Sequence, residues 1–581
     1  MSAVSPEREQ LFARLKTRLE SLRELFGAGS NYARYRAPFD EYLEQREFGL
    51  ALESLCEFLM EPDVRPVSDP EMGEIASLHA VMGVADQCVS KLKKKRVEQA
   101  KQLGLVEEAT GSIKRKAEPI FTAVAATTTP AAPPSPISSS LRYKFIAILG
   151  PYHVHAAGPS DQLASLHPKL VLVPGSESEL AEVLRLANEV GLVVIPRGGA
   201  TKLDWGNAPS RADLILSTAH LNRVLEHASS DLTVTVEAGC TIESLQQTLA
   251  QHGQRLAIDP LWPDKATVGG ILSTNDSGAL RLRFGALRDL IIGVTIALPD
   301  GTLASSGGRV VKNVAGYDLP KLVTGAFGTL GVITRAVFRL HPLPHHSRSL
   351  SISTAQPKET EKCVLAIQNS KLAHTFLQSH FSDETSPVSD ILFEGTEAGL
   401  AAQESQLRNL VAPASVSEAS SPAWTAREGL WNFHDPQTTA IAKISILPAN
   451  LASTIQRIDV SVRVHHLRWR TLIYATGIGW LRLVCQAPVS GDTVERSRTA
   501  LVQLRGALQL LRTELENQGG SLVVLHAPEK MPTFDAWGDA GDALPLMKSV
   551  KHRLDPKKHL EPRPFCRGYM NFLECESSLP L

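Results

Sequence analysis

The sequence predicts a multidomain protein in which α/β and α+β domains follow a separate small all-α module. The first observation is length, since 581 residues are enough for three or four domains of about 100–200 residues each. The second is a segment rich in Pro, Ala, Thr and Ser over 116–141, which separates a helical part from the rest. The third is the pattern after that segment, where short apolar runs typical of buried strands alternate with amphipathic helical stretches.

Composition and charge indicate a globular protein without a nucleic-acid partner. Hydrophobic residues make up 43% of the chain and charged residues 21%, and the net charge is −1, so no overall field attracts nucleic acid or a membrane surface. No apolar run reaches the roughly 18–20 residues that span a bilayer, and no signal-peptide pattern opens the chain. Cytoplasmic localisation is therefore expected.

The cysteines and histidines do not form a metal-site pattern. The seven cysteines include no C-x-x-C pair, which argues against an iron–sulfur cluster, a structural zinc site or a disulfide framework. The paired histidines lack H-E-x-x-H or carboxylate spacing. We expect no metal site in this chain, and the cysteine usage favours a reducing compartment.

Residues 1–115 are expected to form a small helical module. Leucines recur on one face at helical spacing from Leu15 to Leu25, and a second apolar stripe runs from Phe48 to Leu59. The segment 116–141 has no periodicity and little bulk, so it is predicted to be a linker. A protein-interaction or docking role is the favoured hypothesis for this module. An accidental or recent fusion stays an alternative, because such a linker makes the module dispensable to the rest of the fold.

A glycine-rich loop follows the predicted strand at 192–195. It reads Pro-Arg-Gly-Gly-Ala-Thr-Lys-Leu-Asp-Trp-Gly over 196–206. Gly198 and Gly199 let the backbone turn sharply and approach a ligand, and successive amide groups in such a turn can bind a phosphate. The loop follows the second strand of its unit and G-x-G-x-x-G is absent, so a nicotinamide-binding Rossmann fold fits poorly. Taken alone, an ordinary tight turn explains the loop equally well.

Three further glycine-rich stretches follow in the same predicted domain. The stretch 266–278 combines Gly269 and Gly270 with several hydroxyl side chains, and the others cover 307–318 and 325–334. A plain Gly/Ser loop crossing a helix stays an alternative for the first of them. Because glycine permits close approach of the backbone to a ligand, four such loops in one domain favour a long ligand that contacts all of them over four unrelated turns.

These motifs resemble a known family. R-G-G-A-T-K-L-D-W-G (197–206), T-V-G-G (267–270), G-G-R-V-V-K-N-V-A-G-Y-D-L (307–319) and G-A-F-G-T-L-G-V-I-T (325–334) are similar to the PCMH-type FAD-binding domain of vanillyl-alcohol oxidase type flavoproteins. Within that group they look most like the FAD-binding subunit of glycolate oxidase. The resemblance implies two small α/β subdomains that hold FAD, followed by a ferredoxin-like α+β cap.

The resemblance also implies domain limits and cofactor contacts. The FAD-binding domain is expected over 142–345 and the cap over 346–540, and residues 541–581 are expected to return to the FAD domain. The first loop would bind the FAD pyrophosphate, the second would flank the ribityl chain and isoalloxazine, and the last motif would lie near the adenine. The implied cofactor-binding residues are Arg197, Gly198, Gly199, Ala200, Thr201, Lys202, Thr267, Gly269, Gly270, Thr274, Ser277, Gly278, Val332 and Ile333.

Three departures from the family pattern bear on the cofactor. Relatives with covalently bound FAD carry a histidine in the first loop, where this chain has Thr201, so FAD is expected to be non-covalent. Many relatives have glycine at the position of Ala200, whose methyl group would weaken binding if the residue needs a positive φ. The tail over 555–565 keeps Asp-Pro but lacks the Gly-Arg pair common in relatives.

The function implied is that of an FAD-dependent oxidoreductase subunit, which oxidises a 2-hydroxy acid (glycolate or D-lactate) by hydride transfer to flavin N5. The implied partners are an iron–sulfur subunit and a second flavoprotein subunit in a hetero-oligomer, and any membrane association would be peripheral and through those partners. The sequence identifies no catalytic residue. Arg427 could bind a substrate carboxylate, but packing on a tryptophan explains it better. The alternative function is a non-catalytic flavin-holding or assembly subunit with an N-terminal interaction module.

Overall fold

The computed structural model describes residues 15–26, 33–44, 48–59, 71, 75, 78, 139–308, 317–419, 423–432, 435–485, 493–532 and 534–560. The chain divides into two compact units, Met1–Ala131 and Ala132–Leu581. Most of the expected linker over 116–141, the motif residues 309–316 and the tail 561–581 lie outside the described residues.

The first unit is helical where it is described. A helix over 15–22 is followed by η1 (Arg23–Phe26), α2 (Ala33–Glu44) and α3 (Phe48–Leu59). Leucines of both expected stripes are buried together, and Phe39 of α2 joins them. Helix α2 was not predicted, and it carries Pro38 in its interior. Cys56 of α3 is disulfide-bonded, although the cysteine spacing argued against a disulfide framework.

The second unit begins with a four-stranded sheet in the order β1-β2-β4-β3. Its strands are β1 (Val154–Ala156), β2 (Leu170–Leu172), β3 (Val194–Arg197) and β4 (Leu214–Ser217), of which β2, β4 and β3 are parallel. The helical segments before the crossover are α6 (Ser139–Leu149), η3 (Pro151–His153) and η4 (Pro159–Asp161). Strand β3 lies two residues later than predicted, and the first glycine-rich loop begins where it ends. This edge of a parallel sheet is where α/β folds bind ligands.

The crossover helix α7 (Glu177–Glu189) connects β2 to β3, and Ser176 is its N-cap. Ser176 Oγ accepts a hydrogen bond from Glu179 N at 3.2 Å, and Glu179 Oε2 accepts one from Gly175 N at 2.7 Å. These side chains satisfy amide groups that a helix N-terminus leaves free. Leu180, Val183 and Leu184 then place an apolar face on the sheet.

A five-stranded antiparallel sheet follows, in the order β5-β6-β10-β8-β9. Its strands are β5 (Val224–Ala228), β6 (Thr233–Glu237), β8 (Ile291–Ala297), β9 (Leu303–Gly307) and β10 (Val332–Arg339). The connecting segments form η5 (Ser229–Asp231), α8 (Ile242–Ala250), α9 (Val268–Thr274), α10 (Arg281–Phe284), α11 (Leu287–Leu290) and α12 (Leu319–Val323). A short strand, β7 (Gln254–Arg255), pairs with β11 (His341–Pro342). The stretch 266–278 contains α9, which packs on β6 and β10.

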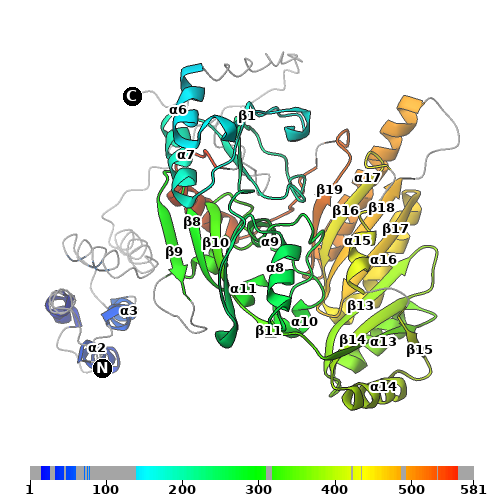
Figure 1. Ribbon diagram of the computed structural model, residues 1–581. Helices are drawn as coiled ribbons and strands as arrows, with labels where there is room; N and C mark the ends of the chain where they lie inside the picture. The colour runs from blue at the N-terminus through cyan, green and yellow to red at the C-terminus, as the bar shows by residue number, and fades with distance from the viewer. Residues whose placement is uncertain are drawn as a thin grey trace, which may run out of the picture. The chain divides into compact units, whose positions relative to one another are not determined.

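The cap is an eight-stranded antiparallel sheet in the order β15-β12-β14-β13-β17-β18-β16-β19 (Figure 1). One half comes from β12 (His346–Ser353), α13 (Pro357–Gln368), β13 (His374–Ser382), β14 (Val388–Gly395), α14 (Glu397–Val411) and β15 (Ser415–Glu418). After α15 (Ala423–Gly429), the other half comes from β16 (Thr439–Ser445), η6 (Pro448–Asn450), α16 (Leu451–Val464), β17 (Leu467–Tyr474), β18 (Ile478–Cys485), α17 (Thr493–Glu516) and β19 (Ser521–His526). Each half is a β-α-β-β-α-β unit, so the ferredoxin-like motif occurs twice, joined edge to edge by β13 and β17.

The two faces of the cap sheet are buried differently. Leu377 and Phe381 of β13 pack with the cap helices, whereas Phe376 packs on the opposite face with Trp205 and Leu261 of the preceding domain. This alternation along one strand turns a complete sheet face toward the glycine-rich loops.

The chain then returns to the first sheet through α18 (Ala543–Leu554). Lys551 Nζ donates to Thr329 O at 2.6 Å, and Val194 N donates to His559 O at 2.8 Å. Leu560 is buried in the core of the first sheet. Among the described residues, every helix is too short or too polar to span a bilayer.

Candidate functional site

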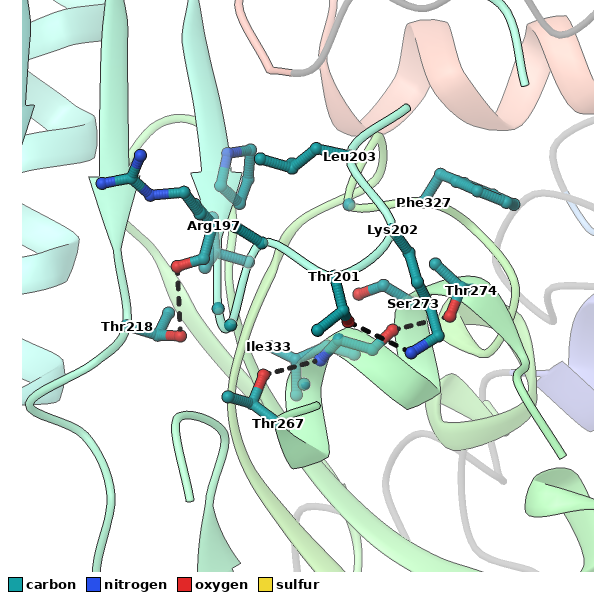
Figure 2. Close-up of a pocket in the computed structure, with 18 of the residues that line it drawn as sticks. Arg197, Thr201, Lys202, Leu203, Thr218, Thr267, Ser273, Thr274, Phe327 and Ile333 are labelled. Carbon is teal, nitrogen blue, oxygen red and sulfur yellow. Dashed lines mark hydrogen bonds between the residues drawn. The ribbon is translucent and has the colours of Figure 1, made fainter. Parts of the chain in front are cut away.

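A cleft opens where β3 ends, between the first sheet and α9. It encloses about 720 Å³, part of it open to solvent. Backbone and small side chains form most of its walls (Figure 2). The lining residues are Pro196, Arg197, Gly198, Gly199, Ala200, Thr201, Lys202, Leu203, Thr218, Thr267, Gly269, Gly270, Ser273, Thr274, Phe327, Gly328, Gly331, Val332 and Ile333. Three glycine-rich segments that are far apart in the sequence therefore meet around one space.

The first loop packs directly on the second, which explains its two glycines. A Cβ at Gly199 would lie 1.8 Å from the backbone oxygen of Lys265, and a Cβ at Gly198 would lie 2.1 Å from Thr267 Oγ1. Both distances are far below van der Waals contact, so neither position accepts a side chain without movement of its neighbour. The cleft is thus shaped by residues that lack Cβ.

Ala200 and Phe327 line the cleft in the left-handed region, with φ of 59° and 54°. This conformation is unfavourable for residues with a Cβ and is the usual reason for glycine at such positions. The condition under which Ala200 was expected to matter, a positive φ, is therefore met. Two of the eight non-glycine residues with positive φ in the described part of the chain line this cleft, and such backbone strain often occurs at functional sites.

The second glycine-rich stretch contains the short helix α9. Thr267 Oγ1 accepts a hydrogen bond from Gly270 N at 3.3 Å, and Thr274 Oγ1 donates to Gly270 O at 2.8 Å (Figure 2). A Cβ at Gly269 would lie 2.9 Å from Ala238 Cβ, so this glycine lets α9 approach the end of β6. The two threonines fix the helix, and the side of α9 with Ser273 faces the cleft.

The structure brings twelve of the fourteen expected cofactor residues to this cleft and leaves two outside. Ser277 and Gly278 are buried beside the cap, where a Cβ at Gly278 would lie 2.0 Å from Asp259 Oδ2. Arg197 contributes backbone, because its guanidinium is directed away and donates to Asp161 Oδ1 at 2.5 Å (Figure 2). Although burial would raise the pKa of Asp161, this hydrogen bond holds it below its ordinary value.

Seven lining residues were not among the expected ones, and two of them, Pro196 and Leu203, flank the expected residues of the first loop. Phe327, Gly328 and Gly331 belong to the G-A-F-G-T-L-G motif, so the sequence contained their signal. Ser273 lies in the small-residue stretch of α9. Thr218, whose backbone N–H donates to Arg197 O at 2.9 Å, follows a plain apolar strand and carries no local signal.

Lys202 connects the cleft to the cap through a buried ion-pair cluster. Its Nζ lies 3.2 Å from Asp276 Oδ2 and donates to Leu261 O at 3.3 Å. Arg427 of the cap donates from Nη1 to Asp276 Oδ1 at 2.9 Å and from Nη2 to Asp259 O at 2.9 Å. The side chains of Lys202, Asp276 and Arg427 are only 1–3% exposed, so this cluster is fully desolvated.

Burial and charge act in opposite directions on this cluster. Burial opposes ionisation of Asp276, but Arg427 and Lys202 outweigh it and hold its pKa below the ordinary value. Burial lowers the pKa of Lys202 in spite of Asp276. Burial raises the pKa of Asp259, which accepts backbone hydrogen bonds from Ala279 and Leu280, to about 6.

Arg427 is occupied by these contacts and also lies 4.9 Å from the centroid of the Trp480 ring. The favoured expectation that it packs on a tryptophan is confirmed, although the partner is Trp480 on β18. Around Lys202, Trp205 stacks on Trp431 with ring centroids 5.7 Å apart, and Trp262 meets Trp431 edge-on at 5.3 Å. The first loop therefore runs from the cleft straight into an aromatic interface with the cap.

Comparison with known proteins shows which family the part of the chain around the first two glycine-rich segments resembles. Residues 168–307 match the family described as FAD binding domain. The chain is 30% identical over 223 residues to glycolate oxidase subunit GlcD of Bacillus subtilis (strain 168), an alignment that covers 37% of this chain and 47% of that protein. It therefore spans about half the length of that relative.

Two further similarities extend over more of the chain. A D-2-hydroxyglutarate dehydrogenase of Xanthomonas citri pv. viticola is 24% identical over 423 residues, covering 68% of this chain and 89% of that protein. The solved structure of an alkyldihydroxyacetonephosphate synthase superposes with a TM-score of 0.57 at 18% identity, covering 76% of this chain and 89% of the other. At this identity the structural similarity establishes the fold alone.

Proposed function

Because residues 168–307 form an FAD-binding domain, we propose that the chain is an FAD-dependent oxidoreductase subunit that oxidises a 2-hydroxy acid. The observation that carries the proposal is the glycine-built cleft that ends at Lys202 against the cap sheet. The relatives support the substrate class, since glycolate and 2-hydroxyglutarate, named in their descriptions, are both 2-hydroxy acids.

The residues present fit the cofactor. No Asp or Glu side chain lines the cleft to repel a phosphate, and the cations Arg197 and Lys202 are themselves paired with Asp161 and Asp276. The backbone of Gly198, Gly199 and Gly270 is accessible without an intervening Cβ, which suits a diphosphate. We propose that these segments hold the pyrophosphate and that Val332 and Ile333 lie near the adenine. Since Thr201 stands where covalently bound relatives have histidine, FAD is proposed to be non-covalent.

FAD, when bound, supplies the hydride acceptor. The chain itself positions the reacting groups and excludes water from them. Asp276 and Leu261 O fix the Lys202 ammonium at the inner end of the cleft. The aromatic interface of Trp205, Trp431 and Trp480 closes that end with apolar surface. Charged groups act more strongly in such a desolvated place than they do in water.

We further propose that the electrons leave to a partner, an iron–sulfur subunit, within a complex that contains a second flavoprotein subunit. The support is the resemblance stated above and the description of one relative as a subunit. The helical first unit, Met1–Ala131, is proposed as a protein-interaction module.

The test uses the purified full chain. We expect bound FAD that acid precipitation releases, and anaerobic loss of its visible absorbance on addition of glycolate, D-lactate or D-2-hydroxyglutarate. FAD that none of these acids reduces would refute the activity of the isolated chain.

A flavin-holding or assembly role is the second candidate. It is favoured by one observation: the residues that line the cleft include no histidine or carboxylate that could take the substrate's hydroxyl proton. Under this alternative, added partner subunits from a cell extract would not restore reduction by substrate, whereas a catalytic subunit that needs its partners would be restored.

A further inference from the structure

A buried ion pair near the end of the described chain connects two walls of the glycine-built cleft. Lys551 of α18 and Asp555 lie four residues apart, and their side chains are only 4% and 0% exposed. Lys551 Nζ donates to Asp555 Oδ2 at 2.5 Å and to Thr329 O at 2.6 Å. Neither member of the pair lines the cleft, and the proposed function assigns no role to either.

One of these walls is the turn that contains Phe327 and Gly328. Both residues line the cleft in the left-handed region, with φ of 54° and 72°. Phe327 N donates to Ser273 O at 2.8 Å, which attaches one side of the turn to α9. The hydrogen bond from Lys551 to Thr329 O attaches the other side. A turn in this conformation keeps its shape only where its surroundings fix it.

The other wall is β3, which leads into the first glycine-rich loop. Leu560 forms a parallel bridge with Val194 of β3, and Val194 N donates to His559 O at 2.8 Å. Asp555 accepts hydrogen bonds from the N–H groups of His559 and Leu560 at 3.0 and 2.9 Å. Lys551 Nζ also donates to Leu560 O at 2.8 Å. The ion pair therefore holds the segment that lies beside β3.

The contacts of Lys551 fix the two walls relative to each other. Its ammonium has three N–H donors, and oxygens of Thr329, Asp555 and Leu560 accept from it. Because the ammonium is buried, separation from any of these oxygens leaves polar groups unsatisfied, which is unfavourable. The walls meet at Gly328, where a Cβ would lie 3.5 Å from Pro196 Cγ of β3. A shift of either wall therefore changes the width of the cleft.

We propose that Lys551 is a positioning residue for FAD, which holds the wall around the adenylate half of the cofactor in place. The inference rests on the cofactor placement in the proposed function, where Val332 and Ile333 lie near the adenine. These two residues follow Thr329 closely in the chain and line the cleft. Since Lys551 does not line the cleft, it acts through Thr329.

The two halves of the cofactor should depend on Lys551 to different extents. The inner end of the cleft, where the proposed function puts the flavin, is held by Lys202 with Asp276 and Leu261 O. None of these contacts involves α18. FMN consists of the flavin half with its phosphate and lacks the adenylate. FMN binding should therefore be nearly independent of Lys551, whereas FAD binding should depend on it.

The experiment compares FAD and FMN binding by the full chain. The flavin is removed from the purified protein, and each flavin is titrated into the apoprotein by fluorescence. Lys551→Met should raise the FAD dissociation constant about tenfold or more, because it removes a charge-assisted hydrogen bond to the cleft wall. The FMN dissociation constant should change by less than about twofold.

Matched variants separate this effect from misfolding. Because Lys551→Met leaves Asp555 buried without a cation, the double variant Lys551→Met/Asp555→Asn is measured beside it. The double variant removes both charges, keeps an oxygen that can accept from Leu560 N, and should show the same selective loss of FAD affinity. Lys551→Arg keeps the charge and should bind FAD more tightly than Lys551→Met. Arg553→Met removes an exposed cation from the same helix and should bind both flavins as wild type does.

The outcomes distinguish the inference from the proposed function. Wild-type FAD affinity in a folded single or double variant would overturn the inference, and so would equal losses of FAD and FMN affinity, which indicate a purely structural role. A wild-type chain that binds no FAD would refute both proposals. Selective loss of FAD affinity, in a protein whose bound FAD no 2-hydroxy acid reduces, would support the positioning role and refute the proposed oxidation.

Discussion

Gly199→Ala should abolish most FAD binding because the first loop cannot accept a side chain there. The new Cβ would lie 1.8 Å from Lys265 O, whereas contacts below 3.0 Å do not occur, so the two segments must separate by about 1.2 Å. The turn that carries Lys265 is held by hydrogen bonds to Trp262 O from Lys265 N at 3.0 Å and Ala266 N at 2.7 Å. The turn therefore resists the displacement that an added Cβ would require.

Overpacking of this kind costs about 1–3 kcal/mol. If the cost falls on the bound conformation of the loop, the FAD dissociation constant rises about 5- to 150-fold. The assay is the FAD content of the purified variant, followed by titration of the apoprotein with FAD by flavin fluorescence.

Gly395→Ala is the matched control, because a Cβ there would have no atom within 4 Å. Thermal unfolding shows whether Gly199→Ala folds. A folded Gly199→Ala protein with wild-type FAD content and affinity would refute the idea that the contact of the two loops shapes the cofactor site.

Three other predictions follow from the same residues. Ala200→Gly should increase the free energy of unfolding by about 0.5 kcal/mol, since relief of the left-handed strain of about 1–2 kcal/mol exceeds the extra entropy of glycine; denaturant titration checks this, and a loss of stability would contradict it. Asp276→Asn should lower the free energy of unfolding by about 3–5 kcal/mol, because it leaves Lys202 and Arg427 buried without a carboxylate. A loss below about 1 kcal/mol in the same denaturant titration would show that the cluster is not desolvated. Because the pKa of Asp259 is raised to about 6 in the folded state, the free energy of unfolding should increase as the pH falls through 6. Between pH 7 and pH 5 the wild-type protein should gain about 1 kcal/mol relative to the Asp259→Asn variant. Identical pH profiles of the two proteins would contradict this prediction.

The glycine-rich loops could be found from sequence because the requirement for close approach acts on single residues. Gly198, Gly199 and Gly269 each lie where a Cβ would meet another segment, so the constraint leaves a visible glycine. The helix α7 was predictable for a similar reason, since Ser176 and Glu179 form a local cap.

The charge cluster could not be found in this way. Asp276 is 74 residues from Lys202 and 151 from Arg427 in sequence, and no local sequence pattern indicates that the three side chains are in contact. The sequence could show that Arg427 was unusual in an aromatic segment, but its carboxylate lies in another domain. Ser277 and Gly278 were expected in the cofactor site for their residue types, and the packing of Asp259 and the cap instead encloses them.

The duplication of the ferredoxin-like motif within the cap could also not be predicted from the sequence. Strands β12 and β15 of its first half carry few buried residues, so no apolar run in the sequence identifies them. A single ferredoxin-like motif was predicted, and the pairing of β13 with β17 that joins two of them depends on contacts between strands about 90 residues apart.

The most direct test of the proposed function is an anaerobic titration of the purified full chain, carrying its FAD, with D-2-hydroxyglutarate. We expect complete loss of the visible flavin absorbance, with one molecule of acid oxidised for each FAD reduced. Bound FAD whose absorbance stays unchanged with this acid, with glycolate and with D-lactate would contradict it.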